Sequence, residues 1–152
     1  MEENTLQTNQ PQFRLFNDRA IYVGTFLGGP LVAGYLIAEN FKRLEAPAEK
    51  IKKTWLISAF VTFLLLCIVF LVPGIDKIPR IVLPLAYSVT TQYLVKHYQG
   101  NDIKAHIESE GQLYSVWRAT WIGLIGAVVF IVLLFLFVIT LSLLGIHNNA
   151  SV

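Results

Sequence analysis

Long apolar runs alternate with short polar stretches along this chain. Four windows hold about 20 mostly apolar residues each, the length of helix that crosses the hydrocarbon core of a bilayer; they are residues 20–40, 54–72, 79–98 and 116–145. The windows show no two-residue alternation and are too long for barrel strands, so helices are favoured. The pattern predicts an all-α fold, a polytopic transmembrane bundle of four helices.

The stretches between the windows agree with this division. Pro47 can open the second helix, and Pro73 to Pro79 forms a short loop before the third. IKAHIESE, residues 103–110, predicts a short helix between the third and fourth windows, lying on the membrane surface or solvated in a loop. We therefore expect a polar N-terminal tail at 1–19, a transmembrane domain at 20–146 and a C-terminal tail at 147–152.

Lysine and arginine are distributed unevenly over the two sides that four crossings would create. Eight fall on one side, namely Lys42, Arg43, Lys50, Lys52, Lys53, Lys96, Lys104 and Arg118. Four fall on the other, namely Arg14, Arg19, Lys77 and Arg80. Loops rich in lysine and arginine stay in the cytoplasm. The bias predicts a cytoplasmic short helix and both termini outside.

Composition narrows the classes of function. The chain is 55% hydrophobic and 14% charged, whereas soluble domains carry about 25% charged residues. A net charge of +2 with no basic run interleaved with aromatics argues against a nucleic-acid partner. Cys67 is the single cysteine, so no intramolecular disulfide can form. The expected surroundings are a lipid bilayer.

Glycine and proline interrupt the first window at FLGGPLVAG, residues 26–34. Small residues let helices approach closely in membranes, and proline removes a helical hydrogen bond and bends the helix. We favour a packing surface with a static kink; the alternative is a broken helix that exposes its backbone to a substrate, as in transporters. The residues expected in packing or kinks are Gly24, Gly28, Gly29, Pro30, Gly34 and, in the third window, Pro84.

Polar residues at depth are concentrated in the third window. Ser88, Thr91 and Gln92 are the best candidates for a polar lining, although hydrogen bonding between helices is the favoured role.

No motif for catalysis is present. We find no phosphate loop, dinucleotide fingerprint or zinc-protease helix, and the acidic residues and histidines from His97 to Glu110 are irregularly spaced for a metal. We expect no catalytic residue, metal or cofactor. An enzyme acting at the cytoplasmic interface would depend on Glu39, His97 and His106.

Two stretches, FLGGPLVAGYLIAENFKRL and YLVKHYQGNDIKAHIESEGQLYSVWRATWIGLIG, carry a resemblance. The chain resembles small uncharacterised bacterial membrane proteins with four spans and a glycine-proline first helix. The resemblance implies a multi-pass protein of the bacterial cytoplasmic membrane and supplies no activity, ligand or site.

Two hypotheses for function follow. The first is a non-enzymatic helix-packing or accessory subunit that associates with itself or with a larger membrane-protein partner. The alternative is an oligomeric small-solute transporter or channel subunit, based on Pro30, Pro84 and the polar residues from Ser88 to Gln92.

Overall fold

The structure, a computed structural model, describes residues 11–144 apart from the side chain of Asp76. The predicted C-terminal tail at 147–152 and the first ten residues of the N-terminal tail lie outside the described residues.

The described chain is almost entirely helical, which confirms the all-α prediction. Three of its helices are long and apolar enough to cross a membrane, as expected of a membrane-embedded protein: α1 (Asp18–Arg43), α2 (Ala48–Leu71) and α5 (Val116–Leu143). The remaining elements are shorter: β1 (Arg14–Leu15), the 3-10 turn η1 (Ile75–Lys77), α3 (Val82–Tyr98), α4 (Gly100–Glu108) and β2 (Gln112–Leu113). The four predicted windows therefore correspond to α1, α2, α3 and α5, and the predicted short helix to α4.

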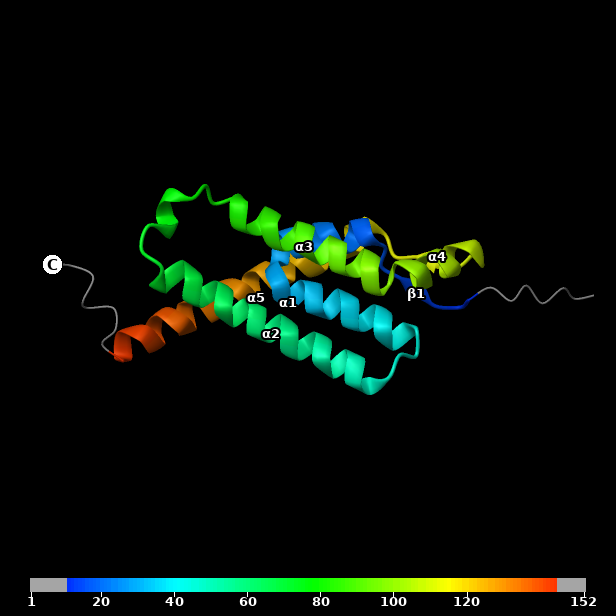
Figure 1. Cartoon of the computed structure of the whole chain (residues 1–152), viewed down its shortest axis with the longest axis horizontal. Coiled ribbons are helices and arrows are strands. Elements are labelled where there is room, and N and C mark those ends of the chain that lie inside the picture. Colours follow the sequence, from blue (N-terminus) through cyan, green and yellow to red (C-terminus); the bar gives the residue numbers. More distant parts are fainter. Residues whose placement is uncertain (1–10, 145–152) are drawn as a thin grey trace, which may run out of the picture.

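Helix α1 folds back on itself. Its backbone leaves the helical conformation at Gly29, where φ is 78° and ψ is −172°. The Phe16 N–H donates to Asn40 Oδ1, and Asn40 Nδ2 donates to the Phe16 carbonyl, both over 2.8 Å. A straight helix would separate these residues by about 36 Å. α1 is therefore a hairpin of two half-helices, residues 18–28 and 30–43, and Figure 1 shows the blue half beside the light-blue half.

The hairpin changes the expected course of the chain. Its open end lies beside residues 11–17, 44–47 and 99–115, and we call this end of the molecule the strand end. The opposite end is formed by residues 72–81 and the end of α5, and we call it the turn end (Figure 1). The first window was predicted to run from one end of the bundle to the other, but the structure brings both of its ends to the strand end. As a result, the described chain starts at one end of the molecule and finishes at the other.

The hairpin is also the centre of the fold, because α2, α3 and α5 each pack against α1. Glycines allow the closest approaches. A Cβ at Gly28 would lie 2.6 Å from the Gly123 carbonyl oxygen of α5, and one at Gly34 would overlap the Ser58 side chain of α2. A Cβ at Gly24 would lie 2.8 Å from Leu36 Cδ1, in the other half of the hairpin. The predicted small-residue surface is thus used within the molecule.

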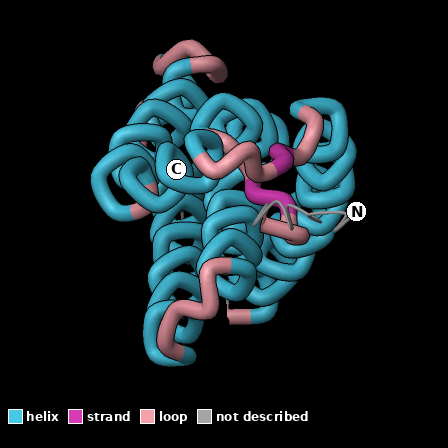
Figure 2. The backbone as a smooth tube through the Cα atoms, turned by 90° about the vertical axis from the view of Figure 1, so that its right-hand side faces the viewer, coloured by secondary structure: helices cyan, strands magenta, loops and turns pink. Residues whose placement is uncertain are grey.

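Two short strands fasten the chain before α1 to the chain before α5. β1 pairs in parallel with β2, with Arg14 opposite Gln112 and Leu15 opposite Leu113. Figure 2 shows these strands in magenta at the strand end. Leu15 and Phe16 are 0% and 1% exposed. The segment predicted as the end of a polar tail therefore contributes to the core, because its apolar residues cover the open end of the hairpin.

Buried amide side chains close the hairpin. Besides its two bonds to Phe16, Asn40 Nδ2 lies 3.3 Å from Gln99 Oε1, and Gln99 Nε2 donates to the Ile37 carbonyl over 3.0 Å. Both amides are fully buried. Hydrogen bonds between buried groups hold a unique geometry, since leaving any partner unpaired is costly.

Replacing Asn40 with alanine should destabilise the protein strongly. The N–H and C=O of Phe16 and the amide of Gln99 would lose buried partners, so the free energy of unfolding should fall by about 2–4 kcal/mol. The measurement is reversible unfolding in mild detergent, with Asn101→Ala, at an exposed position of α4, as a control that should stay within about 0.5 kcal/mol of the parent. Equal stability of the two variants would contradict the assigned role of Asn40.

Candidate functional site

The break in α1 has a conformational cause. The φ and ψ of Gly29 fall in a region that glycine alone adopts readily. Space is not the restriction, since a Cβ there would meet only Phe130 Cδ2, at 3.9 Å. Pro30 then starts the second half-helix, a position where a missing N–H costs nothing. The Gly-Gly-Pro sequence thus produces a complete break with a reversal of direction, where a static kink was favoured.

The second half-helix is anchored beside the break. Ser58 Oγ of α2 donates a 2.7 Å hydrogen bond to the Pro30 carbonyl. Ser58 is buried, and Thr62 one turn later bonds back to the Ser58 carbonyl. The break is therefore positioned against α2 by a specific polar contact as well as by packing.

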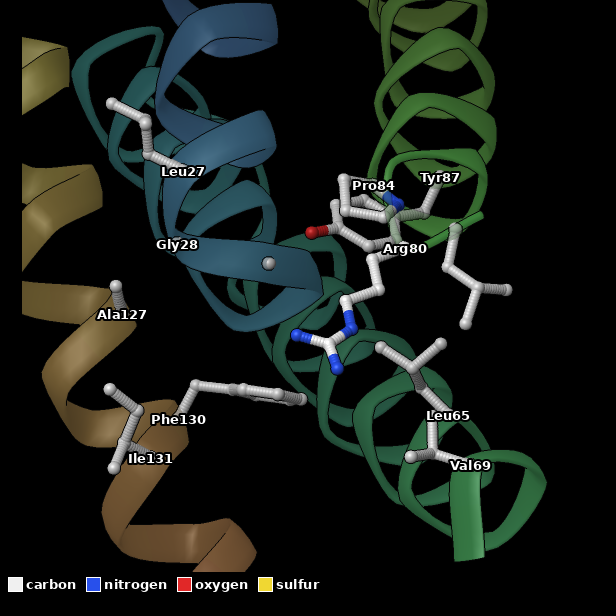
Figure 3. A pocket seen from close by; sticks show the side chains of 12 residues that line it. Leu27, Gly28, Leu65, Val69, Arg80, Pro84, Tyr87, Ala127, Phe130 and Ile131 are labelled. Atoms are coloured by element: carbon white, nitrogen blue, oxygen red, sulfur yellow. The ribbon is translucent and has the colours of Figure 1, made fainter. Parts of the chain in front are cut away.

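A cavity of about 250 Å³ lies at the tip of the hairpin. It is bounded by α1, α2, α3 and α5, and by the turn that precedes α3. Figure 3 shows the Arg80 guanidinium and the Tyr87 hydroxyl pointing into it. The other lining residues are glycine or apolar: Leu27, Gly28, Gly29, Leu65, Val69, Leu83, Pro84, Ala127, Phe130 and Ile131. We call this space the tip cavity.

Polar groups also lie along the interface between α1 and α3. Lys96 Nζ and Gln92 Nε2 of α3 each lie 3.5 Å from Asp18 Oδ2, at the start of α1. The first half of α1 runs antiparallel to α3, and this pairing fixes the register of the two helices. Gly29 and Pro84 both line the tip cavity. In antiparallel helices, Thr25, one turn before Gly29, and Ser88, one turn after Pro84, therefore come to about the same level.

The two hydroxyls at that level have no hydrogen-bond partner among the described residues. Thr25 and Ser88 are both 0% exposed, and the oxygen of each is buried. Hydroxyls in helices ordinarily bond to the carbonyl one turn back, as Thr90 bonds to Ala86. Buried unpaired polar groups are uncommon and require a physical reason, such as a bound water or solute.

A second hollow, of about 460 Å³, lies at the strand end of the same interface. Its polar and charged lining residues are Asn17, Asp18, Lys96, Asn101 and Lys104. Hollows therefore lie near both ends of the contact between the first half of α1 and α3, one shared with α2 and α5 and the other shared with α4, and these two helices carry the two unpaired hydroxyls.

The structure separates the predicted residues into distinct roles. Gly24, Gly28 and Gly34 make close contacts, whereas Gly29 and Pro30 form the break. Pro84 lies in the first turn of α3, where it interrupts no helical hydrogen bond, so the expected kink is not present there.

The predicted polar lining is only partly enclosed. Ser88 and Thr91 are buried, at 0% and 9% exposed, on the helix that packs against α1. Gln92 is partly exposed and is bonded to Asp18.

Four important residues were not identified from the sequence. They are Arg80, Asn40, Thr25 and Gln99, of which only Arg80 enters the sequence analysis, as one of the charges that set the predicted orientation. Their roles depend on the fold-back of α1, which apolar length does not encode.

The residues on which an interfacial enzyme would depend each have another partner. Glu39 Oε1 pairs with Arg43 at 3.0 Å, and His97 packs against the rings of Tyr93 and Tyr98. His106 is 4% exposed, and its Nε2 lies 3.0 Å from the Gln112 carbonyl oxygen. Within residues 11–144, no three His, Cys, Asp or Glu side chains are placed to hold a metal.

Comparisons with protein-family models, with curated proteins and with solved structures gave no match for this chain. The resemblance to small bacterial four-span proteins stays a prediction.

Alanine at Gly29 should destabilise the protein although there is room for the methyl group. The cost is backbone strain of about 1–3 kcal/mol in the free energy of unfolding. Gly100→Ala is the matched control, because there is room for its Cβ, with nothing within 4 Å, and its φ is not positive. The free energies of unfolding of the two variants in detergent are compared. Equal values would contradict the need for glycine at the break.

Proposed function

We propose that this protein is a non-enzymatic integral membrane protein of the bacterial cytoplasmic membrane that binds and passes a small solute, as a transporter or channel subunit. The observation that carries this proposal is the helical hairpin, whose tip meets a half-open cavity between the helices. Within a bilayer, a backbone outside the regular helix is tolerated where it is buried in protein or lines a cavity. Broken helices with this property form the solute sites of many transporters.

The helix lengths support three crossings and one re-entrant hairpin. At 1.5 Å per residue, α2, α3 and α5 are about 36, 26 and 42 Å long, close to or above the hydrocarbon thickness of about 30 Å. The half-helices of α1 are about 16 and 21 Å long, so the tip would stop inside the bilayer.

The charge distribution supports an orientation. Ten of the twelve lysines and arginines lie at the strand end once α1 is folded back, and Lys77 and Arg80 are the two at the turn end. Under the positive-inside rule the strand end faces the cytoplasm, with the N-terminal side of the chain, and the turn end faces outward. This differs from the arrangement expected from four crossings, because Arg14 and Arg19 change sides.

The α1–α3 interface offers the best candidate for a solute path. The tip cavity lies at the outer end of this interface, and the second hollow lies at its cytoplasmic end. Thr25 and Ser88 lie between them with unpaired hydroxyls. We propose that water or a solute occupies this level during passage.

The accessory-subunit hypothesis was based on the small-residue surface of α1. Helices of the same chain cover this surface, so it does not offer a contact for a partner. One observation still favours the hypothesis. Most of α5 beyond the hairpin exposes large apolar side chains, including Val132, Phe135, Leu136 and Ile139 at 52–61% exposure. Lipid or a partner helix would cover them. The mass of the complex after gentle extraction separates these cases, since a stoichiometric second protein would favour the accessory role.

Impermeant thiol labelling tests the orientation. In a Cys67→Ser background, Lys77→Cys should react from outside intact cells, whereas Gln12→Cys and Glu45→Cys should react only after permeabilisation. Reaction of Gln12→Cys from outside would contradict the proposed orientation and agree with four crossings.

Flux into proteoliposomes tests the path. We expect uptake of at least one of sodium, chloride, glycerol or benzoate above that of empty vesicles. Ser88→Leu should reduce this uptake several-fold by filling the interface, while Thr90→Leu, on an exposed face of the same helix, should not. Absence of uptake for all four solutes would contradict a transport role.

A further inference from the structure

The tip cavity combines features that select a class of ligand. We propose that it binds a small organic anion, with the anionic oxygens at Arg80 and Tyr87 and the apolar part against Leu65, Leu83 and Phe130. The inference rests on the proposed function, because it names the solute class for the same cavity.

Charge is the first argument. Arg80 is the only charged residue among the described residues that line the cavity, and no carboxylate is among them. The Arg80 guanidinium points into the cavity (Figure 3). The planar guanidinium fork matches carboxylate and phosphate oxygens in a bidentate manner.

The surroundings of Arg80 add donors of the same kind. The Tyr87 hydroxyl points into the cavity and can donate a hydrogen bond. Gly28 and Gly29, at the break of α1, line it as well. Guanidinium and phenol together favour a negative group.

The remaining lining limits the body of the ligand. Apart from Arg80, Tyr87 and the two glycines, every described lining residue is apolar. The volume of about 250 Å³ is below the usual range of about 300–1,000 Å³ for sites of drug-sized ligands. A monoanion with a hydrocarbon part fits this lining, whereas the hydroxyls of a nucleotide or a sugar phosphate would find few polar partners on it.

The anion can come from solution, as a free organic acid, or from the membrane, as the phosphate of a lipid. Both present anionic oxygens beside an apolar group. Access from either source is compatible with the structure, since Arg80 as a whole residue is exposed at the turn end.

Equilibrium binding to the purified full chain in uncharged detergent tests the inference. Benzoate is the probe, benzyl alcohol its uncharged counterpart, and isothermal titration the measurement. Arg80→Gln should weaken benzoate binding about ten- to hundredfold, the loss expected when a charged hydrogen-bonding partner is removed. Lys77→Gln, which removes a neighbouring charge that does not line the cavity, should leave binding unchanged.

Several results would overturn the inference: no binding of any anion by the parent protein, equal binding of benzyl alcohol, or Arg80→Gln binding as well as the parent. The thermal midpoint of Arg80→Gln shows whether the variant is folded, and Arg80→Lys, which keeps the charge, should restore part of the affinity.

Dihexanoyl phosphatidic acid identifies the source. Displacement of benzoate by this lipid at lower concentration would assign the site to a lipid phosphate, and preference for benzoate would assign it to a free acid. Binding without flux would support this inference and contradict the transport proposal. Flux without anion binding would support the transport proposal and contradict this inference.

Discussion

Gly29 holds the backbone at φ 78° and ψ −172°, and the positions of the other helices follow from the reversal it permits. Because α1 turns back there, its two ends meet at the strand end and its tip stops inside the bundle. α2, α3 and α5 then pack around a pair of half-helices instead of one straight helix. The space left beyond the tip becomes the cavity that contains Arg80 and Tyr87.

The hairpin is held at both ends by different interactions. At the tip, glycine contacts to α5 and the Ser58 bond to Pro30 fix the break in place. At the open end, Asn40 joins the two ends of α1 directly through Phe16, and Gln99 attaches α3 to the same point. Polar contacts of this kind are specific in apolar surroundings, since each buried donor and acceptor is costly to leave unpaired.

The sequence predicts the elements well and their arrangement poorly. The length of the apolar runs defines α1, α2 and α5, because hydrophobic residues must be covered by lipid or by protein. Proline and glycine residues between the runs mark where the helices end. The direction of a helix after a break is not part of that signal. FLGGPLVAG indicated an irregularity, but the fold-back depends on Asn40 and Phe16, which are 24 residues apart and resemble an ordinary helix end and tail. The candidate site was missed for the same reason, since Arg80 reaches the break only in three dimensions.

The distance between the two ends of α1 tests the hairpin most directly. Spin labels at Arg19 and Lys42, both exposed, can be introduced into a Cys67→Ser background and measured in lipid by double electron–electron resonance. A straight helix would hold the labelled residues about 35 Å apart. The hairpin predicts a single distribution well below that distance, shortened by the contact between Phe16 and Asn40. A distribution centred near the straight-helix value would contradict the hairpin and the site built on it.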